Sequence, residues 1–147
     1  MEDLKNRLGV YTAIALYSLY IVMFILRLLG YPQAGHWVAS VQFVAIVPLI
    51  FLLTRARRKQ RPALYIIQIV LMLAFLVIEF LIDYVYQIEF RQVQWMVIPY
   101  VTIFFAATGG LLGLAFDTQE QSWRISALVL YLLMAILAFV QRAITGM

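Results

Sequence analysis

The chain divides into long apolar stretches separated by short polar ones. Intervals without a charged residue cover 8–26, 28–54, 62–78, 92–116 and 125–141. Each interval is near or above the roughly 17 residues that a helix needs to cross a bilayer. The pattern therefore predicts an all-α fold, a polytopic membrane protein built as an up-and-down bundle of five transmembrane helices.

Glycine, proline and polar residues set the expected ends of these helices. Gly30 and Pro32 end the first span, the segment 55–62 separates the second from the third, and 117–122 separates the fourth from the fifth. Pro48 predicts a kink within the second span, because neighbouring helices in lipid can satisfy the freed carbonyl. The expected spans, in a single transmembrane domain over 1–147, are 9–29, 37–54, 63–86, 95–116 and 123–140.

Composition assigns these apolar helices to a membrane. Of the 147 residues, 65% are hydrophobic and only 12% are charged. A soluble domain with so few charges would lack a polar surface, so a soluble enzyme, a nucleic-acid-binding domain and a disordered chain are excluded. The chain has no cysteine, which excludes disulfides, thiolate metal sites and a thiol nucleophile.

The distribution of basic residues predicts the orientation. With the N-terminus in the cytoplasm, Arg27, Arg91 and Arg142 lie outside, and the other eight basic residues lie inside. Because cytoplasmic loops carry the excess of Lys and Arg, we expect a cytoplasmic N-terminus and, after five crossings, an external C-terminus. The eight expected on the inner side are Lys5, Arg7, Arg55, Arg57, Arg58, Lys59, Arg61 and Arg124.

Polar residues within the spans gather on one face of the third. Its members recur every three or four residues, so they share a side of the helix. At about 1.5 Å of rise per residue, Glu79 and Asp83 come to the same outer level as Arg27. Charges facing hydrocarbon are costly, so this group is a candidate binding site. The face comprises Gln68, Met72, Phe75, Glu79, Asp83 and Tyr86.

Two interpretations of this outer group remain open. Arg27 can form an interfacial salt bridge with Glu79 or Asp83 that holds the first span against the third. Alternatively, the two carboxylates, one turn apart, repel each other and form a proton- or cation-binding vestibule.

His36, the only histidine, is expected on the same outer side. One imidazole and two carboxylates form a known ligand set for non-haem iron. A lone histidine beside Trp37 at a helix start is more typical of the membrane interface. We therefore count His36 with the candidate binding residues and expect no metal site and no cofactor.

Two further features concern partners. Gly109 and Gly113 give the fourth span a small-residue face suited to helix packing, either within the monomer or against another membrane protein or a second copy. The loop with Arg55, Arg57, Arg58, Lys59 and Arg61 is expected to meet anionic lipid headgroups on the cytoplasmic side. Nucleic-acid binding is not expected, because so short a loop offers no scaffold for a groove.

Two function classes follow from these features. No catalytic residue can be assigned, since the sequence offers no nucleophile–base pattern and no phosphate-binding glycine loop, so an enzyme is the less favoured class. The preferred class is a non-catalytic structural or accessory subunit of a larger membrane assembly. The alternative is a small oligomeric transporter or channel that uses Glu79 and Asp83 near the outer side.

Overall fold

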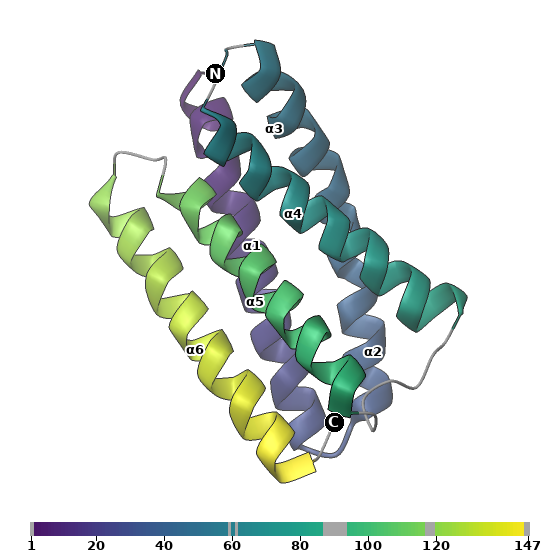
Figure 1. The fold of residues 1–147 in the computed structure, drawn as a ribbon. Helices are drawn as coiled ribbons and strands as arrows, with labels where there is room; N and C mark the ends of the chain where they lie inside the picture. Colours follow the sequence, from purple (N-terminus) through teal and green to yellow (C-terminus); the bar gives the residue numbers. More distant parts are fainter. Residues whose placement is uncertain (1, 59, 61, 87–93, 117–119, 146–147) are drawn as a thin grey trace.

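The chain is helical throughout the part that the structure describes. This structure, a computed structural model, describes residues 2–58, 60, 62–86, 94–116 and 120–145. Within these ranges there is no strand, which confirms the all-α expectation. The elements, arranged as a helical bundle in Figure 1, are α1 (Glu2–Leu28), α2 (Pro32–Ser40), a 3₁₀ segment η1 (Val41–Ala45), α3 (Ile46–Arg58), α4 (Ala63–Glu79), a π-helical segment η2 (Phe80–Val85), α5 (Gln94–Ala115) and α6 (Gln121–Thr145).

Five helical stretches of the described chain are long and apolar enough to cross a membrane. They match the five expected spans in number and order, and two of them extend further than expected. The second and the fifth continue into polar residues at both ends, because helical hydrogen bonding does not stop where the apolar run stops. The stretches are Leu8–Leu28, Gln33–Arg58, Ala63–Val85, Trp95–Ala115 and Gln121–Ile144.

Glycine ends α1 at the expected place. Gly30 has a φ of +87°, and its N–H donates to the carbonyl of Arg27 at 3.2 Å. The N–H of Tyr31 reaches back to the carbonyl of Leu26 at 2.9 Å. This pair of bonds is a Schellman motif, in which the left-handed residue turns the chain back over the last helical turn. The chain can therefore enter α2 after a very short turn.

The helical geometry changes just before Pro48. Residues Val41–Ala45 adopt the tighter 3₁₀ form between α2 and α3. Pro48 has no N–H, so the carbonyl of Val44, four residues earlier, lacks its normal helical partner. The second span is therefore continuous in sequence and irregular in geometry, as a proline at this position favours.

The first helix lies at the centre of the bundle. It packs against α2, α3, α5 and α6, while α4 packs against α3 and α5. Buried residues make up 56% of the α1 span and 11% of the α6 span, so α6 lies at the edge. The N-terminus and the C-terminus lie at opposite ends of the bundle (Figure 1).

Glycines in α1 and α5 lie where helices approach closely. A Cβ at Gly9 would lie 3.2 Å from the carbonyl oxygen of Leu114, and one at Gly113 would overlap the carboxamide of Gln68. A Cβ at Gly109 would meet only the hydroxyl of Tyr131, at 3.6 Å. The small-residue face of α5 therefore contacts α4 and α6 within this molecule.

Candidate binding cavity

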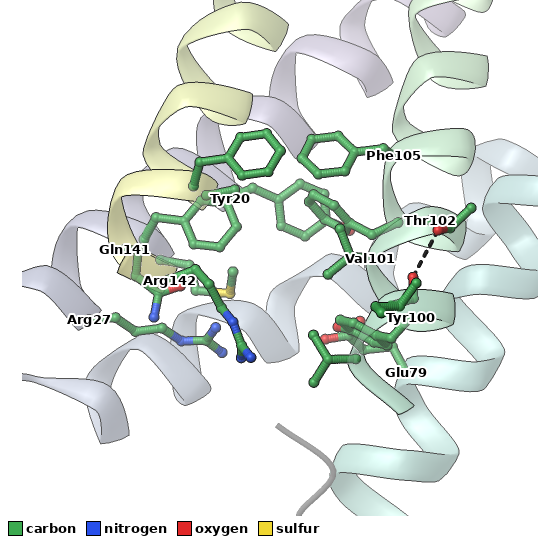
Figure 2. Close-up of a pocket in the computed structure, with 16 residues that line it drawn as sticks. Tyr20, Arg27, Glu79, Tyr100, Val101, Thr102, Phe105, Gln141 and Arg142 are labelled. Carbon is green, nitrogen blue, oxygen red and sulfur yellow. Dashed lines mark hydrogen bonds between the residues drawn. The ribbon is translucent and has the colours of Figure 1, made fainter. Parts of the chain in front are cut away.

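A cavity of about 350 Å³ lies between α1, α4, α5 and α6, near the end of the bundle where α1 and α6 finish (Figure 2). Its polar lining residues are Tyr20, Arg27, Glu79, Tyr100, Thr102, Gln141 and Arg142. The rest of the wall is mainly apolar and aromatic. It includes Met23, Phe24, Val97, Ile98, Val101, Phe104, Phe105, Ala138 and Phe139.

Two arginines reach the cavity from neighbouring helix ends. Arg27 lies in the last turn of α1 and Arg142 in the last turn of α6. Cations are favoured there, because the carbonyl end of a helix carries partial negative charge. In Figure 2 both guanidinium groups point into the space from one side, and Glu79 and Tyr100 lie across from them. The polar end of the cavity is therefore lined from opposite sides by groups of opposite charge.

Glu79 is a buried carboxylate held by a tyrosine. It is the last residue of α4, its side chain is 5% exposed, and the Tyr100 hydroxyl donates to its Oε2 at 2.5 Å. Burying a carboxylate is unfavourable unless hydrogen bonds or charges compensate for the lost water. The bond from Tyr100 supplies part of that compensation and joins α4 to α5.

The deep wall of the cavity is closed by aromatic rings. Phe104 makes edge-to-face contacts with Tyr20, Phe24 and Phe75, at centroid distances of 5.4, 6.3 and 5.5 Å. Beneath this wall the Tyr20 hydroxyl donates to Gln42 Oε1 at 2.7 Å. Toward the other end of the bundle, α1 and α5 continue with fully buried side chains such as Leu111. The cavity therefore has one deep, closed side.

Two of the four binding residues expected from the sequence line the cavity. Arg27 and Glu79 line the same cavity, whereas Asp83 and His36 are not among its described lining residues. Whether Arg27 forms an ion pair with either carboxylate stays a prediction. Asp83 lies in η2, where the wider π-helical turn changes the angular spacing between residues four apart. The four-residue spacing that favours one face of an α-helix therefore does not place Asp83 with Glu79 in the described cavity lining.

His36 belongs to an aromatic contact that joins α2 to η2. Its ring stacks on Tyr84 with a centroid distance of 4.5 Å, and the Tyr84 hydroxyl donates to the His36 carbonyl oxygen at 2.9 Å. Phe43 meets the same tyrosine edge-on at 5.2 Å. Among the described residues, no group of three His, Cys, Asp or Glu side chains is placed to hold a metal ion. The iron alternative for His36 therefore gains no support.

Five polar lining residues were not identified as site residues from the sequence. They are Tyr20, Tyr100, Thr102, Gln141 and Arg142. Arg142 entered the argument only through the count that set the orientation. Arg142 lies close to the outer end of the fifth span, as Arg27 lies close to the outer end of the first. This shared position is the signal that would have placed the two arginines at one level.

The basic segment after the second span lies outside the cavity. Arg57 and Arg58 are exposed and Arg55 is half-buried in the last turn of α3. Lys59 and Arg61 lie outside the described residues. An interaction of this segment with lipid headgroups stays a prediction.

Comparison of the chain with protein-family models, with curated proteins and with solved structures gives no match. Any function must therefore be argued from the geometry of the bundle and its cavity.

Proposed function

We propose that the five long helices cross a bilayer in alternating directions, with the N-terminus in the cytoplasm and the C-terminus outside. The support is the eight-to-three distribution of basic residues between the two predicted sides. The exposed Arg57 and Arg58, at the end of α3, then face anionic headgroups of the inner leaflet. In this orientation the cavity lies at the outer surface.

Reporter fusions test this orientation. A periplasm-active phosphatase fused after the C-terminus should be active, and a fluorescent protein that matures only in the cytoplasm should be dark there. Fusions at Gln60, between the second and third spans, provide the matched control and should give the opposite pair of signals. A fluorescent C-terminal fusion with a silent phosphatase would mean that either the orientation or the number of crossings is wrong.

With this orientation, we propose that the protein is a non-catalytic accessory subunit of a larger membrane assembly. It holds a ligand in its cavity and does not conduct that ligand across the bilayer. The closed deep side of the cavity carries this proposal. Between the aromatic wall at Phe104 and the far end of α5, Ala107, Leu111 and Leu114 are at most 1% exposed. Such close packing leaves no space for a hydrated solute.

The arrangement of glycines weakens one argument for a partner. The α5 face with Gly110 and Gly113 already packs on Gln68 of α4, so it does not offer a vacant docking surface. A partner is more simply accommodated by the edge helix α6, since only 11% of its span is buried within this chain.

The partner state after mild detergent extraction tests the accessory role. The tagged chain, isolated from its native membrane in a neutral maltoside, should run as a complex with one different membrane protein at fixed stoichiometry. The control for adventitious capture is a detergent extract of membranes that lack the tagged chain, mixed with the purified tagged chain after lysis. A bare monomer or a homo-oligomer would contradict the proposal.

A small oligomeric transporter is the second candidate. The observation that favours it is the buried carboxylate of Glu79 in a cavity that also contains two arginines. Buried carboxylates among charged neighbours are frequent in proton-coupled sites.

A further inference from the structure

The cavity has the charge distribution of a site for an anion. Its described lining contains two guanidinium groups, those of Arg27 and Arg142, and one carboxylate, that of Glu79. The formal charge of the lining is therefore positive by one. A ligand group with a single negative charge would balance it, and arginine presents its donors in the planar arrangement that suits carboxylate and phosphate oxygens.

The cavity also has a gradient from polar to apolar. Arg27 and Arg142 lie in the last turns of their helices, and the wall becomes aromatic toward Tyr20. From Arg27 to Tyr20 is roughly 10 Å along the helix, at about 1.5 Å per residue. A ligand that fills this space presents a charged group at the membrane surface and an apolar part toward the hydrocarbon. An amphiphile has this shape, whereas a free inorganic anion would leave the apolar part unfilled.

Exposed lining residues place part of the cavity wall on the outer surface of the bundle, beside the stacked rings of Phe105 and Phe139, whose centroids lie 5.4 Å apart. Ile98 on α5 and Phe139 on α6 both line the cavity and are 60% and 64% exposed. Thr102, one turn along α5 from Ile98, is exposed as well, and its hydroxyl donates to the Ile98 carbonyl oxygen at 2.8 Å. These residues flank the space between α5 and α6 in an otherwise apolar surface. A molecule dissolved in the surrounding leaflet could enter the cavity there without crossing water.

We propose that this cavity binds a single-chain amphiphile with one anionic headgroup, taken from the surrounding leaflet between α5 and α6. Arg27 and Arg142 bind the headgroup, and the apolar wall of Phe105, Ala138 and Phe139 contacts the chain. The volume of about 350 Å³ lies at the small end of the range for ligand pockets, which favours one acyl chain over two. The inference rests on the proposed function, because it names the ligand of the same cavity.

Native mass spectrometry of the full chain in neutral maltoside tests the proposal. Myristoyl lysophosphatidylglycerol, with one negative charge, is compared with myristoyl lysophosphatidylcholine, which has the same chain and no net charge. We expect one bound copy of the first and at least about tenfold weaker binding of the second, because its phosphate is accompanied by a choline cation that the two arginines repel. The deacylated headgroup glycerophosphoglycerol, which carries the same charge without a chain, should not bind measurably.

Charge variants identify the residues involved. Arg27→Gln and Arg142→Gln should each weaken lysophosphatidylglycerol binding about tenfold. Arg27→Lys, which keeps the charge, should retain most of the affinity. Arg124→Gln is the matched control, because Arg124 is an exposed arginine at the opposite end of α6. A loss of affinity in Arg124→Gln equal to that in Arg142→Gln would overturn the proposal.

A second variant covers the case in which an arginine variant does not fold. Ala138→Phe fills the apolar wall and leaves all charges in place, so it should abolish binding while helicity and melting temperature stay near the parent values. Equal binding of the two lysolipids, or binding of glycerophosphoglycerol alone as tight as that of the lysolipid, would also overturn the proposal. Because these measurements use the isolated chain, a protein that binds the lysolipid but forms no hetero-complex would refute only the accessory role.

Discussion

Within the described part of the chain, tyrosine hydroxyls donate hydrogen bonds from one helical element to another. Tyr17 bonds the Thr108 carbonyl, Tyr20 bonds Gln42, Tyr84 bonds the His36 carbonyl and Tyr100 bonds Glu79. In the bilayer proposed for these helices, lipid provides no hydrophobic force between them, so association depends on packing and on such bonds, each worth about 0.6 kcal/mol on average. At the residue scale, these tyrosine hydroxyls join helices.

Tyr20 and Gln42 provide a test at this scale. Gln42 is 1% exposed, its Oε1 accepts from Tyr20, and its Nε2 has no hydrogen-bond partner in the described part of the chain. Gln42→Leu would leave the Tyr20 hydroxyl buried without an acceptor, and Tyr20→Phe would leave the carboxamide without its one bond. We expect each single variant to lower the free energy of unfolding by about 1–3 kcal/mol.

The double variant should be close to the parent or more stable, because removing both polar partners removes the buried unsatisfied atoms together. Reversible unfolding in mixed micelles, followed by circular dichroism, measures the cycle. Tyr31→Phe, at a residue that is 61% exposed, is the control for loss of a hydroxyl. Additive effects of the two substitutions would show that the two side chains are not coupled.

At the scale of the elements, small residues decide how closely the helices approach. Gly9 in α1 faces the backbone of α5, and Gly110 in α5 faces Gln68 in α4, where a Cβ would lie 3.4 Å from the Gln68 Cα. Irregular segments act at the same scale. The 3₁₀ turn η1 precedes Pro48, and the π turn η2 places Tyr84 against α2.

Gly9 gives the clearer test of how closely α1 and α5 approach. A Cβ there would press on the Leu114 carbonyl oxygen, which belongs to backbone and cannot swing away as a flexible side chain can. Gly9→Leu should therefore separate α1 from α5 and destabilise the fold by about 1–3 kcal/mol. Gly109→Ala is the comparison, because its Cβ has room and alanine is the better helix former, by up to about 1 kcal/mol.

Thermal unfolding in detergent is measured for three variants, Gly9→Leu, Gly9→Ala and Gly109→Ala. Gly9→Ala should melt below Gly109→Ala although the chemical change is the same. If Gly9→Leu melts with the parent, the contact between α1 and α5 is looser than described.

At the scale of the whole molecule, the question is whether the buried carboxylate serves assembly or transport. Glu79 joins α4 to α5 through Tyr100, and the core beyond the cavity is closed. A closed core in one conformation favours a rigid subunit. A transporter would need a second conformation in which these side chains separate.

The double variant Glu79→Gln with Asp83→Asn separates the two roles. We expect a lower expression level and a lower melting temperature, because the Tyr100–Glu79 bond loses its charge assistance, and no change in pH-driven flux into reconstituted vesicles. Asp83→Asn alone is the matched control, since Asp83 lies outside the described cavity lining. A double variant that melts like the parent while a pH-dependent flux disappears would establish the carboxylate as a transport site.

The sequence by itself determined the helical class, the number of long apolar helices and several of their ends. These are properties of single segments. An apolar run such as 62–78 must form its backbone hydrogen bonds internally in lipid, and a glycine such as Gly30 ends a helix through its own φ. The level of Arg27 and Glu79 also followed from the sequence, because a helix has a fixed rise per residue.

Only the tertiary structure decided which residues meet. The cavity combines the ends of four helices, and its described lining includes Glu79 but not Asp83, although their spacing suggested one face. The small residues of α5 gave no sign of whether they faced a partner or Gln68 of the same chain. Such relations depend on how each helix is rotated about its own axis, and that rotation is fixed by close packing between helices, which no single segment encodes.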